Sequence, residues 1–491
     1  MRSILPKILI LLLLSFALAS CKTAPPKPFG ACPTPQQVEW QKMEINMFCH
    51  FGPNTFSGAE WGDGKEAEDL FNPTHLDCRQ WAKIAHNAGM GGIIITAKHH
   101  DGFCLWPSKQ STHTVAFSSW REGKGDVLRE LGEACSDEGI AMGVYISPWD
   151  RNAPSYGTEQ YNKTFQQTLE EVLSQYGATG KDGKRRIYEQ WFDGANGEGP
   201  NGKRQEYDWS LFNSTVARLQ PDAVIFSDVG PGCRWVGNEN GEAGETCFST
   251  LNTEGFSPGA GSPHTDTLNH GNLNGQHWIP AETDVSIRPG WFWHEGEHPK
   301  SLDELLRIYY TSVGRNSLLL LNVPPDRRGL IAAEDSIRLL EFRSALDSIF
   351  GTDLAQKATI TASSTYGRKH EKNYRAENLL DADYDKYWAA SDRDSGQTVL
   401  KLTFDAPVTF NRIMLQEYIP LGQRITHLSI AYIDTDGKRH RLTEATTVGY
   451  KRILLTPTVT AKQLMICIDE TLAPPIMNRV GLFMDNIYNA Q

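Results

Sequence analysis

The 491-residue sequence has little clustered positive charge. Its 48 Lys and Arg residues stand against 59 Asp and Glu residues, which gives a formal net charge of −11. No Lys- or Arg-rich run forms a surface that could neutralise phosphate groups, so we expect no nucleic acid partner. The sequence also has no internal repeats and no low-complexity tracts, which argues against a solenoid and against wholesale disorder.

Cysteine is scarce as well. The chain has nine cysteines, and none of them form a Cys-x-x-Cys pair. Because zinc sites built on cysteine usually contain such pairs, the sequence indicates no zinc site. An exported chain could form disulfides, but the spacing does not show which cysteines would pair.

Long hydrophobic runs are missing except near the N-terminus. Residues 8–19 form an apolar run of twelve, which is shorter than the roughly 20 residues that a helix needs to span a bilayer. Arg2 and Lys7 precede this run. Residues 1–20 therefore have the pattern of a signal peptide.

The end of the apolar run resembles the lipobox of bacterial lipoproteins. It reads Leu18-Ala19-Ser20-Cys21, and in such proteins cleavage precedes a cysteine that is then lipidated. The alternative is a simple cleavage site with an accidental cysteine beside it. Residues 21–34 are expected to be a polar, proline-containing tether. A lipid on Cys21 would hold an exported protein at a membrane, in the bacterial periplasm or at the outer membrane or cell surface.

The length predicts two domains, because an ordinary domain has roughly 100 to 200 residues. Strand-like and helical patterns alternate through residues 35–350, which predicts parallel βα units and an α/β fold of the (β/α)8-like TIM barrel type. Residues 234–293 lack a clean helix, so long loops are expected there. The predicted strands are 44–51, 92–96, 141–147, 188–192, 223–227 and 318–323, and the predicted helices are 76–88, 126–137, 160–175, 209–219, 302–312 and 332–349.

The pattern changes near residue 351. Short alternating runs separated by turn residues fill residues 351–491, which predicts an all-β sandwich. The predicted strands are 358–363, 399–404, 410–416, 427–433, 452–455 and 463–468.

Polar and aromatic side chains follow several barrel strands, where such barrels place their catalytic residues. His50 ends the first predicted strand, and His99 and His100 follow the second. A single histidine at a strand end is usually structural, but polar and aromatic residues recur at the ends of successive strands. The three histidines lack acidic companions at metal-site spacing, so we expect neutral imidazoles that donate hydrogen bonds to hydroxyl groups, and no bound metal.

Asp193 is the sharpest single candidate, because it directly follows an apolar strand in Trp191-Phe192-Asp193-Gly194. Its alternative role is to cap the next helix. Glycoside hydrolysis would need a second carboxyl group beside Asp193. One of the two groups attacks or activates water, and the other protonates the leaving oxygen. Glu239 lies about one βα unit further on. Its rivals for that role are Glu242, Glu245, Glu282 and Asp284.

Taken together, several motifs resemble glycoside hydrolase family 29, the α-L-fucosidases, over about residues 35–350. They are His-Phe-Gly at 50–52, Ala-Lys-His-His-Asp-Gly-Phe at 97–103, Trp-Phe-Asp-Gly-Ala at 191–195, Arg-Pro-Gly-Trp at 288–291 and Leu-Leu-Leu-Asn-Val-Pro-Pro at 319–325. The resemblance implies that Asp193 is the nucleophile. The run Trp-Val-Gly-Asn-Glu at 235–239 resembles the branch selective for α-1,3 and α-1,4 linkages, which implies that Glu239 is the acid/base.

The same resemblance implies the sugar-binding residues and the reaction. The residues implied to grip fucose are His50, Glu60, Trp61, His99 and His100, with Tyr145 a weaker match and Trp291 or Trp293 as an apolar wall. The implied activity is that of a retaining exo-α-L-fucosidase without a required cofactor, which releases terminal α-1,3- or α-1,4-linked fucose from branched, Lewis-type oligosaccharides and glycoconjugates by double displacement. Two alternatives stay open. One is a catalytically silent glycan-binding surface lipoprotein, and the other is a hydrolase for another sugar.

The C-terminal part resembles the discoidin or F5/8 type C fold, which many carbohydrate-binding modules use. The stretch 376–390 and the strand at 399–404 carry this resemblance. The domain either binds glycan or packs on the barrel as a structural appendage, and Trp388 fits the core better than a binding platform. Asp381, Asp383 and Asp385 could help to hold a structural Ca²⁺ ion, but alternating Asp residues in a turn are more often only solvated.

Overall fold

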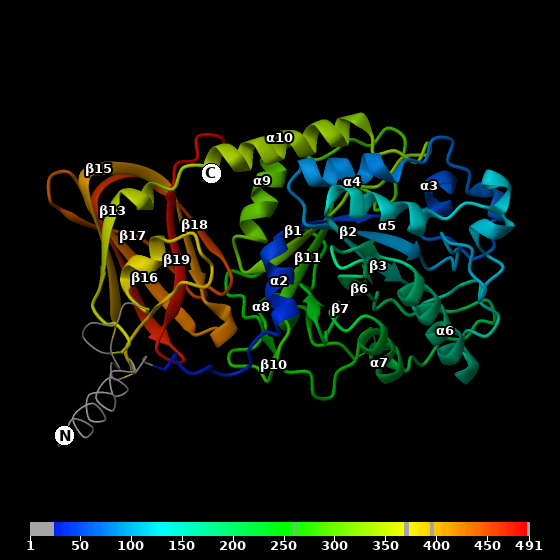
Figure 1. The fold of residues 1–491 in the computed structure, drawn as a ribbon, viewed down its shortest axis with the longest axis horizontal. Helices are drawn as coiled ribbons and strands as arrows, with labels where there is room; N and C mark the ends of the chain where they lie inside the picture. The colour runs from blue at the N-terminus through cyan, green and yellow to red at the C-terminus, as the bar shows by residue number, and fades with distance from the viewer. Residues whose placement is uncertain (1–23, 260, 368–372, 393–396, 489–491) are drawn as a thin grey trace, which may run out of the picture.

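The computed structural model describes residues 24–259, 261–367, 373–392 and 397–488. The predicted signal peptide and Cys21 lie outside these residues. Figure 1 shows a barrel wrapped by helices on one side and an antiparallel β domain on the other. No helix in the described part of the chain is long and apolar enough to cross a membrane.

Eight parallel strands close the barrel in the order β1-β12-β11-β8-β7-β6-β3-β2, which confirms the predicted fold. The strands are β1 (Ile45–Cys49), β2 (Gly92–Lys98), β3 (Ala141–Ile146), β6 (Glu189–Trp191), β7 (Val224–Ser227), β8 (Cys233–Trp235), β11 (Ala281–Ser286) and β12 (Ser317–Asn322). Six of them match predicted strands. The other two, β8 and β11, were missed because β8 is three residues long and β11 carries polar residues on its inward face.

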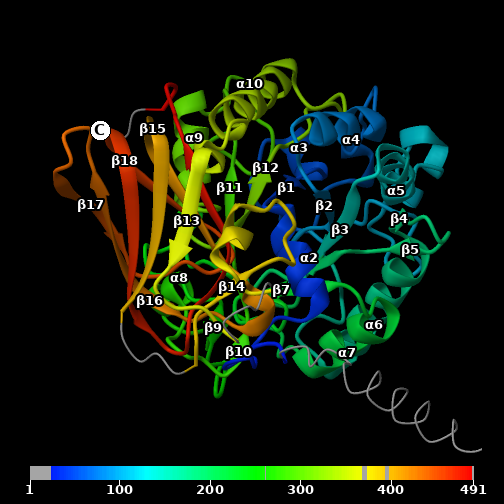
Figure 2. The ribbon, with the colours of Figure 1, turned by 60° about the vertical axis from the view of Figure 1, so that its left-hand side comes forward.

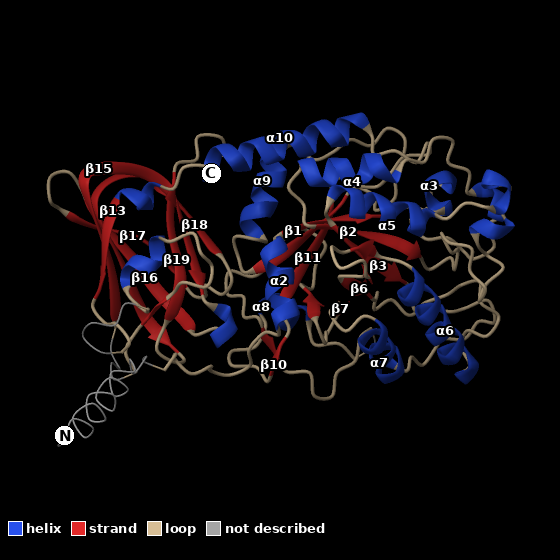
Figure 3. Ribbon diagram, in the orientation of Figure 1, coloured by secondary structure: helices blue, strands red, loops and turns tan. Residues whose placement is uncertain are grey.

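The six predicted helices are all present, and Figure 3 shows them around the barrel. They are α4 (Cys78–Asn87), α5 (Val127–Glu138), α6 (Glu159–Gln175), α7 (Trp209–Leu219), α9 (Leu302–Thr311) and α10 (Ala333–Phe350). Side-chain caps mark several N-termini, including Asp126 on α5 and a Ser301 and Glu304 capping box on α9. Each cap satisfies backbone N–H groups that a helix leaves free.

The barrel is irregular between β7 and β11, as expected. This region contains a short helix α8 (Thr265–His270) and a hairpin of β9 (Thr250–Leu251) and β10 (His277–Trp278). Smaller elements elsewhere in the barrel domain are α3 (Pro53–Ser57), β4 (Ala178–Thr179), β5 (Arg185–Arg186) and the 3-10 turns Glu68–Leu70, Val115–Phe117 and Trp120–Gly123.

Helix α2 (Pro35–Met43), which the sequence did not predict, lies at the N-terminal end of the barrel strands. A capping box of Thr34 and Gln37 begins it. The Gln37 amide donates to the carbonyls of Gly232 (2.7 Å) and Trp278 (2.8 Å), and Trp40 is buried in the cluster that fills the barrel interior. The helix therefore closes the barrel opposite its mouth.

The C-terminal domain is one antiparallel sheet with the strand order β14-β19-β15-β18-β16-β17, and β13 pairs with β15. Its strands are β13 (Ala358–Ala362), β14 (Trp388–Ala389), β15 (Thr398–Glu417), β16 (Ile425–Ile433), β17 (Arg439–Ala445), β18 (Arg452–Thr471) and β19 (Ile476–Phe483), with 3-10 turns at Leu354–Lys357, Ala376–Leu380 and Ile419–Leu421. Figure 2 shows the long strands from another side. The predicted all-β, antiparallel character is confirmed, and the strands pair in one connected sheet. We keep the name sandwich for this domain.

Two pairs of runs predicted as separate strands in the sandwich are halves of single strands. The runs 399–404 and 410–416 both belong to β15, and 452–455 and 463–468 both belong to β18. Register shifts interrupt the β15–β18 ladder between Thr403 and Val408, so the polar residues at this point form an irregularity instead of a turn. Strands β17 and β19 were not predicted.

The sandwich has an apolar core of its own, and Trp388 lies fully buried in it. The Trp388 indole donates to the carbonyl of Ser364 (3.0 Å), so this side chain is part of the core, as the sequence indicated. In the nearby acidic turn, Lys386 pairs with Asp381 at 2.7 Å, and the backbone N–H of Asp385 donates to Asp383.

The contacts that join the sandwich to the barrel domain include three sets. Arg412 and Asp485 form a buried ion pair, at 2.9 Å, that also binds the Tyr310 hydroxyl. Thr447 accepts a hydrogen bond from the backbone N–H of Cys247 (3.0 Å). The third set involves the segment before α2, which was predicted to be a tether.

Residues of this N-terminal segment bind the sandwich. The backbone N–H of Phe29 donates to the carbonyl of Leu421 (3.1 Å), and Arg424 donates to the carbonyl of Lys27 (2.7 Å). The chain thus starts its described course on the sandwich before it enters the barrel. All eight cysteines in the described part of the chain are free thiols, seven of them buried.

Candidate active site

A cavity of about 180 Å³ opens at the C-terminal ends of the barrel strands. We call it the mouth pocket. Its lining is rich in aromatic rings and carboxyl groups, and it contains every predicted site residue except Tyr145. The lining residues are Phe48, His50, Glu60, Trp61, His99, His100, Trp191, Asp193, Ala195, Glu239, Asp284 and Trp291.

Asp193 follows β6 and points into this pocket. The backbone N–H of Ala195 donates to its Oδ1 (2.7 Å), and the hydroxyl of Tyr145 donates to its Oδ2 (3.0 Å). Burial raises the pKa of Asp193, whereas the two donors lower it. Tyr145 therefore lies directly behind the pocket and holds the carboxylate in place. Asp193 caps none of the described helices, so its predicted alternative role is not observed.

Glu239 reaches the pocket from the loop after β8. The indole N–H of Trp291 donates to its Oε2 (3.3 Å). Desolvation raises the pKa of Glu239, the Trp291 hydrogen bond lowers it, and the negative charge of Asp193 raises it further. These surroundings favour a carboxyl group that keeps its proton to a higher pH than an ordinary Glu.

The structure shows which of the carboxyl groups that rival Glu239 line the mouth pocket. Glu242 pairs with Arg307 (2.6 Å) and Glu245 with Arg315 (3.3 Å), both outside the mouth pocket. Glu282 is buried beneath the pocket and does not line it. Asp284 is the one rival that lines the pocket together with Glu239.

Two histidines of the pocket are fixed by hydrogen bonds at Nδ1. His50 Nδ1 lies 2.9 Å from Oδ1 of Asn322, and His100 Nδ1 lies 2.8 Å from Oγ of Ser147. Because the Ser147 hydroxyl donates to the carbonyl of Trp149 (2.8 Å), the proton between Ser147 and His100 belongs to the imidazole. The network thus assigns a proton to Nδ1 in both rings and leaves Nε2 as an acceptor.

Burial disfavours the charged form of all three histidines, which favours the neutral imidazoles that the sequence predicted. Burial lowers the pKa of His50 and of His100 to about 3 and holds that of His99 well below its ordinary value. His50 and His100 differ from the expectation in one respect. The tautomers assigned above leave Nε2 of both rings without a proton, whereas donation was expected. Nε2 of His100 lies 3.6 Å from Oδ2 of Asp193.

Glu60, Trp61 and Trp291 shape the rim of the pocket. The carboxylate of Glu60 accepts from the backbone N–H of Trp291 (2.8 Å) and also binds His294, so it fixes the Trp291 ring beside Glu239. Trp61 is 61% exposed and stands edge-on to His100, with ring centroids 5.8 Å apart. Such an exposed aromatic face suits the apolar side of a sugar ring. Trp293, the alternative to Trp291, does not line the pocket.

Side chains on neighbouring strands form layers beneath the pocket, because alternate residues of a strand share a face. On β6, Glu189 and Trp191 precede Asp193 on the inward face. The Trp191 ring stacks on Phe226 at 4.1 Å and donates to Oε1 of Glu282 (2.8 Å). Phe48 lies beside Trp191 with ring centroids 5.1 Å apart. These aromatic rings form the floor of the mouth pocket.

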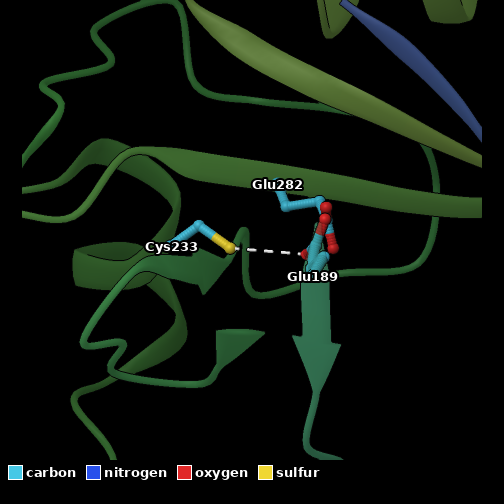
Figure 4. A group of neighbouring side chains, drawn as sticks. All are labelled: Glu189, Cys233 and Glu282. Carbon is cyan, nitrogen blue, oxygen red and sulfur yellow. Dashed lines mark hydrogen bonds between the residues drawn. The ribbon is translucent and has the colours of Figure 1, made fainter. Parts of the chain in front are cut away.

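Below this floor, Glu189, Cys233 and Glu282 lie close together (Figure 4). Their side chains are of types that bind metals, yet protein donors account for most of their oxygens. Trp40 donates to Glu189 (2.8 Å), and the Cys233 thiol donates to the other oxygen of Glu189 (3.6 Å). Burial raises the pKa of Glu189 to about 7 and that of Glu282 well above its ordinary value. Oε2 of Glu282 has no other hydrogen-bond partner among the described residues, and a proton shared with Glu189 would satisfy it.

Several residues of the site had no sequence signal of their own. Phe48 could have been found from strand alternation, since it shares a face with His50. Asn322, Ser147 and His294 act only through the residues that they orient, and sequence spacing does not reveal such contacts.

A larger cavity, of about 640 Å³, lies between α2, α10 and the sandwich. Its charged groups neutralise one another, since Arg343 pairs with Asp347 (2.7 Å) and Lys451 with Glu44. Unlike the mouth pocket, it is lined by several basic side chains, among them Lys42, Arg343 and Lys451. We therefore place the active site in the mouth pocket.

Similarity to known proteins identifies the family of the chain. The family model for α-L-fucosidases matches residues 29–347. The chain belongs to the α-L-fucosidase family. It is a glycoside hydrolase of family 29, and a model for the F5/8 type C domain matches residues 359–473.

Similar α-L-fucosidases span almost the whole chain. Alpha-L-fucosidase 1 of Arabidopsis thaliana is 44% identical over 94% of this chain and 89% of its own length. The crystal structure of SpGH29 superimposes with a TM-score of 0.87 at 36% identity, covering 94% of this chain and 100% of that one. A Ruminococcus gnavus GH29 fucosidase in complex with fucose gives a TM-score of 0.85 at 31% identity, covering 95% and 97%. Both domains therefore belong to one shared architecture.

Proposed function

We propose that this α-L-fucosidase is a retaining exo-enzyme, with Asp193 as nucleophile and Glu239 as general acid/base. The observation that carries the proposal is that both carboxyl groups line one small pocket. In this pocket, burial and the negative charge of Asp193 raise the pKa of Glu239. A retaining hydrolase needs two carboxyl groups about 5 to 5.5 Å apart on either side of the scissile bond. No metal or other cofactor takes part in this scheme.

In the first step, Asp193 attacks the anomeric carbon while Glu239 gives its proton to the departing oxygen. Hydrogen bonds from Ala195 and Tyr145 hold the Asp193 carboxylate for this attack. In the second step, the ionised Glu239 takes a proton from water, which then breaks the fucosyl ester. Glu239 regains its starting protonation state, and Asp193 is released as a carboxylate.

The remaining pocket residues are proposed to bind fucose. Nε2 of His50 and of His100 would accept hydrogen bonds from sugar hydroxyls, and His99 lies between them in the wall. Trp291 would cover the C5 methyl group, and Trp61 and Glu60 would border the ring at the rim. The small volume of the pocket supports binding of one terminal sugar, as an exo-enzyme requires.

We also propose that the enzyme prefers fucose linked α-1,3 or α-1,4 in branched, Lewis-type glycans. The run Trp-Val-Gly-Asn-Glu at 235–239 supports this preference, since it resembles the branch of the family selective for these linkages. Rates on a Lewis-type trisaccharide and on 2′-fucosyllactose, measured side by side with an aryl fucoside, test the proposal. Cleavage of 2′-fucosyllactose as fast as that of the Lewis substrate would refute it.

A catalytically silent binding protein is the weaker alternative. It would have no use for two ionisable groups that face one bond, and the family is one of hydrolases. If the enzyme cleaves none of these three substrates but binds them, this alternative replaces the proposal. A hydrolase for a different sugar would cleave another aryl glycoside faster than the fucoside.

We further propose that the protein is an exported lipoprotein, held at a membrane through a lipid on Cys21. The support is the signal peptide pattern of residues 1–20 and the lipobox-like run that ends at Cys21. Labelled fatty acid should enter the natural protein and not a Cys21→Ser variant. Incorporation into both would refute the assignment.

A further inference from the structure

Asp284 is a third carboxyl group in the mouth pocket, next to the two proposed to carry the reaction. It lies on β11 two residues after Glu282, so both side chains face the barrel interior, with Asp284 one layer nearer the mouth. Only 4% of Asp284 is exposed, yet it lines the pocket. Its small exposed surface therefore faces the space in which the sugar would bind.

Protein contacts use only part of the hydrogen-bonding capacity of this group. The indole N–H of Trp235 donates to Oδ1 (3.0 Å). No other side chain donates to the Asp284 carboxyl group within the described ranges of the chain. A buried carboxyl group with one donor is poorly satisfied, and such groups usually have a further partner. Here the missing partner lies on the pocket side.

The charges around the pocket decide the protonation state. Four carboxyl groups line it, those of Glu60, Asp193, Glu239 and Asp284, while no Lys or Arg side chain does. Burial raises the pKa of Asp284 well above the ordinary value, and the nearby charges of Glu239 and Asp193 raise it further. A carboxylic acid that stays neutral in an apolar site can donate a hydrogen bond, and other enzymes use one in this way.

We propose that Asp284 binds the substrate directly, donating its O–H hydrogen bond to a hydroxyl group of the fucose ring. In this role it complements the histidines, because Nε2 of His50 and of His100 can only accept. The pocket would thus offer a fixed donor on the β11 side and fixed acceptors on the β1 and β2 sides. A hydroxyl group can satisfy both types at once, which orients the ring before Asp193 attacks.

This proposal rests on the proposed function only in placing fucose in the mouth pocket. It gives Asp284 a role other than that of the acid/base, which must exchange its proton in every turnover. Glu239, which is more exposed, suits that task better.

Three variants separate donation from charge and from packing. Asp284→Asn keeps a neutral donor of the same shape, whereas Asp284→Leu and Asp284→Ala remove it. Thr283→Val is the matched control, since Thr283 is also buried on β11 but faces the opposite side and bonds Ser317. L-Fucose binding to each folded variant is measured by calorimetry, and kcat/KM is measured on 4-nitrophenyl α-L-fucoside.

We expect Asp284→Leu and Asp284→Ala to weaken fucose binding and to lower kcat/KM by about ten- to hundredfold, as loss of a buried hydrogen bond does. Asp284→Asn should stay within about fivefold of the natural enzyme, and Thr283→Val should match it. An Asn variant as defective as the Leu and Ala variants would overturn the proposal.

Aryl fucosides that lack one hydroxyl at C2, C3 or C4 give the decisive comparison. If Asp284 donates to one ring hydroxyl, the substrate that lacks this hydroxyl gains nothing from Asp284. The natural enzyme and Asp284→Ala should then cleave that one substrate at the same rate. An equal penalty on all three would refute contact with the ring. Fucose binding tests Asp284 even if the hydrolytic roles of Asp193 and Glu239 fail, so the two proposals can fail separately.

Discussion

Glu417 of the sandwich and Asp193 of the barrel are both carboxyl groups inside the protein, and their surroundings differ. Glu417 accepts hydrogen bonds from the backbone N–H groups of Arg424 (2.6 Å), Ile425 (2.9 Å) and Gly449 (2.7 Å). Both of its oxygens are thus used within the protein, and it ties three segments together. Burial raises the pKa of Glu417 to about 7 against these donors.

The carboxyl groups of the mouth pocket are held more loosely. Asp193 has two donors, and Glu239 and Asp284 each have one. Their remaining capacity faces an open space, as a reacting or binding group requires. The contrast leads us to expect that burial alone does not mark a functional carboxyl group, and that burial with unused hydrogen-bonding capacity beside a cavity does.

The strongest test of this contrast removes one carboxyl group from each domain. Asp193→Ala should lower kcat on an aryl fucoside by about 10⁴-fold or more, because the covalent step has no other nucleophile. Glu417→Ala should lower the free energy of unfolding but leave kcat of the folded enzyme unchanged. The activity per folded molecule is measured for both variants, and urea unfolding gives their stability. If Glu417→Ala lost as much activity as Asp193→Ala, the contrast would be contradicted.

Glu239→Ala should have the next largest effect, and its size should depend on the leaving group. Hydrolysis of a Lewis trisaccharide should fall by about 10²- to 10⁴-fold, since the sugar oxygen needs the proton of Glu239. An aryl fucoside with a good leaving group should lose less in the glycosylation step. Equal losses on both substrates would show that Glu239 is not the acid. Glu242→Ala, on the same loop, is the control.

The carboxyl pair beneath the pocket floor should make stability depend on pH. Burial raises the pKa of Glu189 from 4.5 to about 7, so its contribution is complete below about pH 4.5 and is lost as the pH rises through about 7. The expected loss between pH 4 and pH 8 is about 2 to 3 kcal/mol. In Glu189→Gln the amide N–H₂ can replace the shared proton, so the loss should shrink.

Urea unfolding at several pH values measures this effect. Other groups with raised pKa values, such as those of Asp101 and Glu417, are the same in both proteins, so only the difference between the two pH profiles matters. Parallel profiles for Glu189→Gln and the natural protein would contradict a proton shared with Glu282.

The smallest expected effect concerns the contact between the two domains. Thr447→Val removes the acceptor for the buried N–H of Cys247 and should cost about 1 kcal/mol of stability. Turnover of aryl fucoside and of Lewis trisaccharide should not change, because Cys247 does not line the pocket. Thr446→Val, at a partly exposed neighbouring contact, is the control. If Thr447→Val lost affinity for glycan without losing stability, the result would instead favour glycan binding by the sandwich.

Much of the fold could be predicted where the inward face of a strand is apolar. Strand β12 reads as a hydrophobic run and was predicted almost to the residue, whereas β11 carries Glu282 and Asp284 on its inward face and was missed. The same polar residues explain both the missing strand and part of the site. In the sandwich, the irregularity after Thr403 resembles a turn in sequence, and only the pairing with β18 shows that β15 continues.

The site was predictable where a residue ends a strand, as with His50, His100 and Asp193. The hydrogen bonds that set function were not. The tautomer assigned to His100 depends on Ser147 and on the carbonyl of Trp149, and the place of Trp291 depends on Glu60. Such contacts join residues far apart in the chain, so no local pattern reveals them. Asp284 was recognised only as a rival acid, since spacing cannot show which carboxyl group lacks partners.

The contact of the N-terminal segment with the sandwich also sets an order of events during synthesis. Arg424 and Lys27, which meet there, are 397 residues apart in the chain. At about 5 to 20 residues per second, a ribosome needs roughly 20 to 80 s to make the chain between them. Lys27 can therefore meet Arg424 only when almost the whole chain has been made. An enzyme truncated after α10 would never complete this contact, however well its barrel strands had assembled.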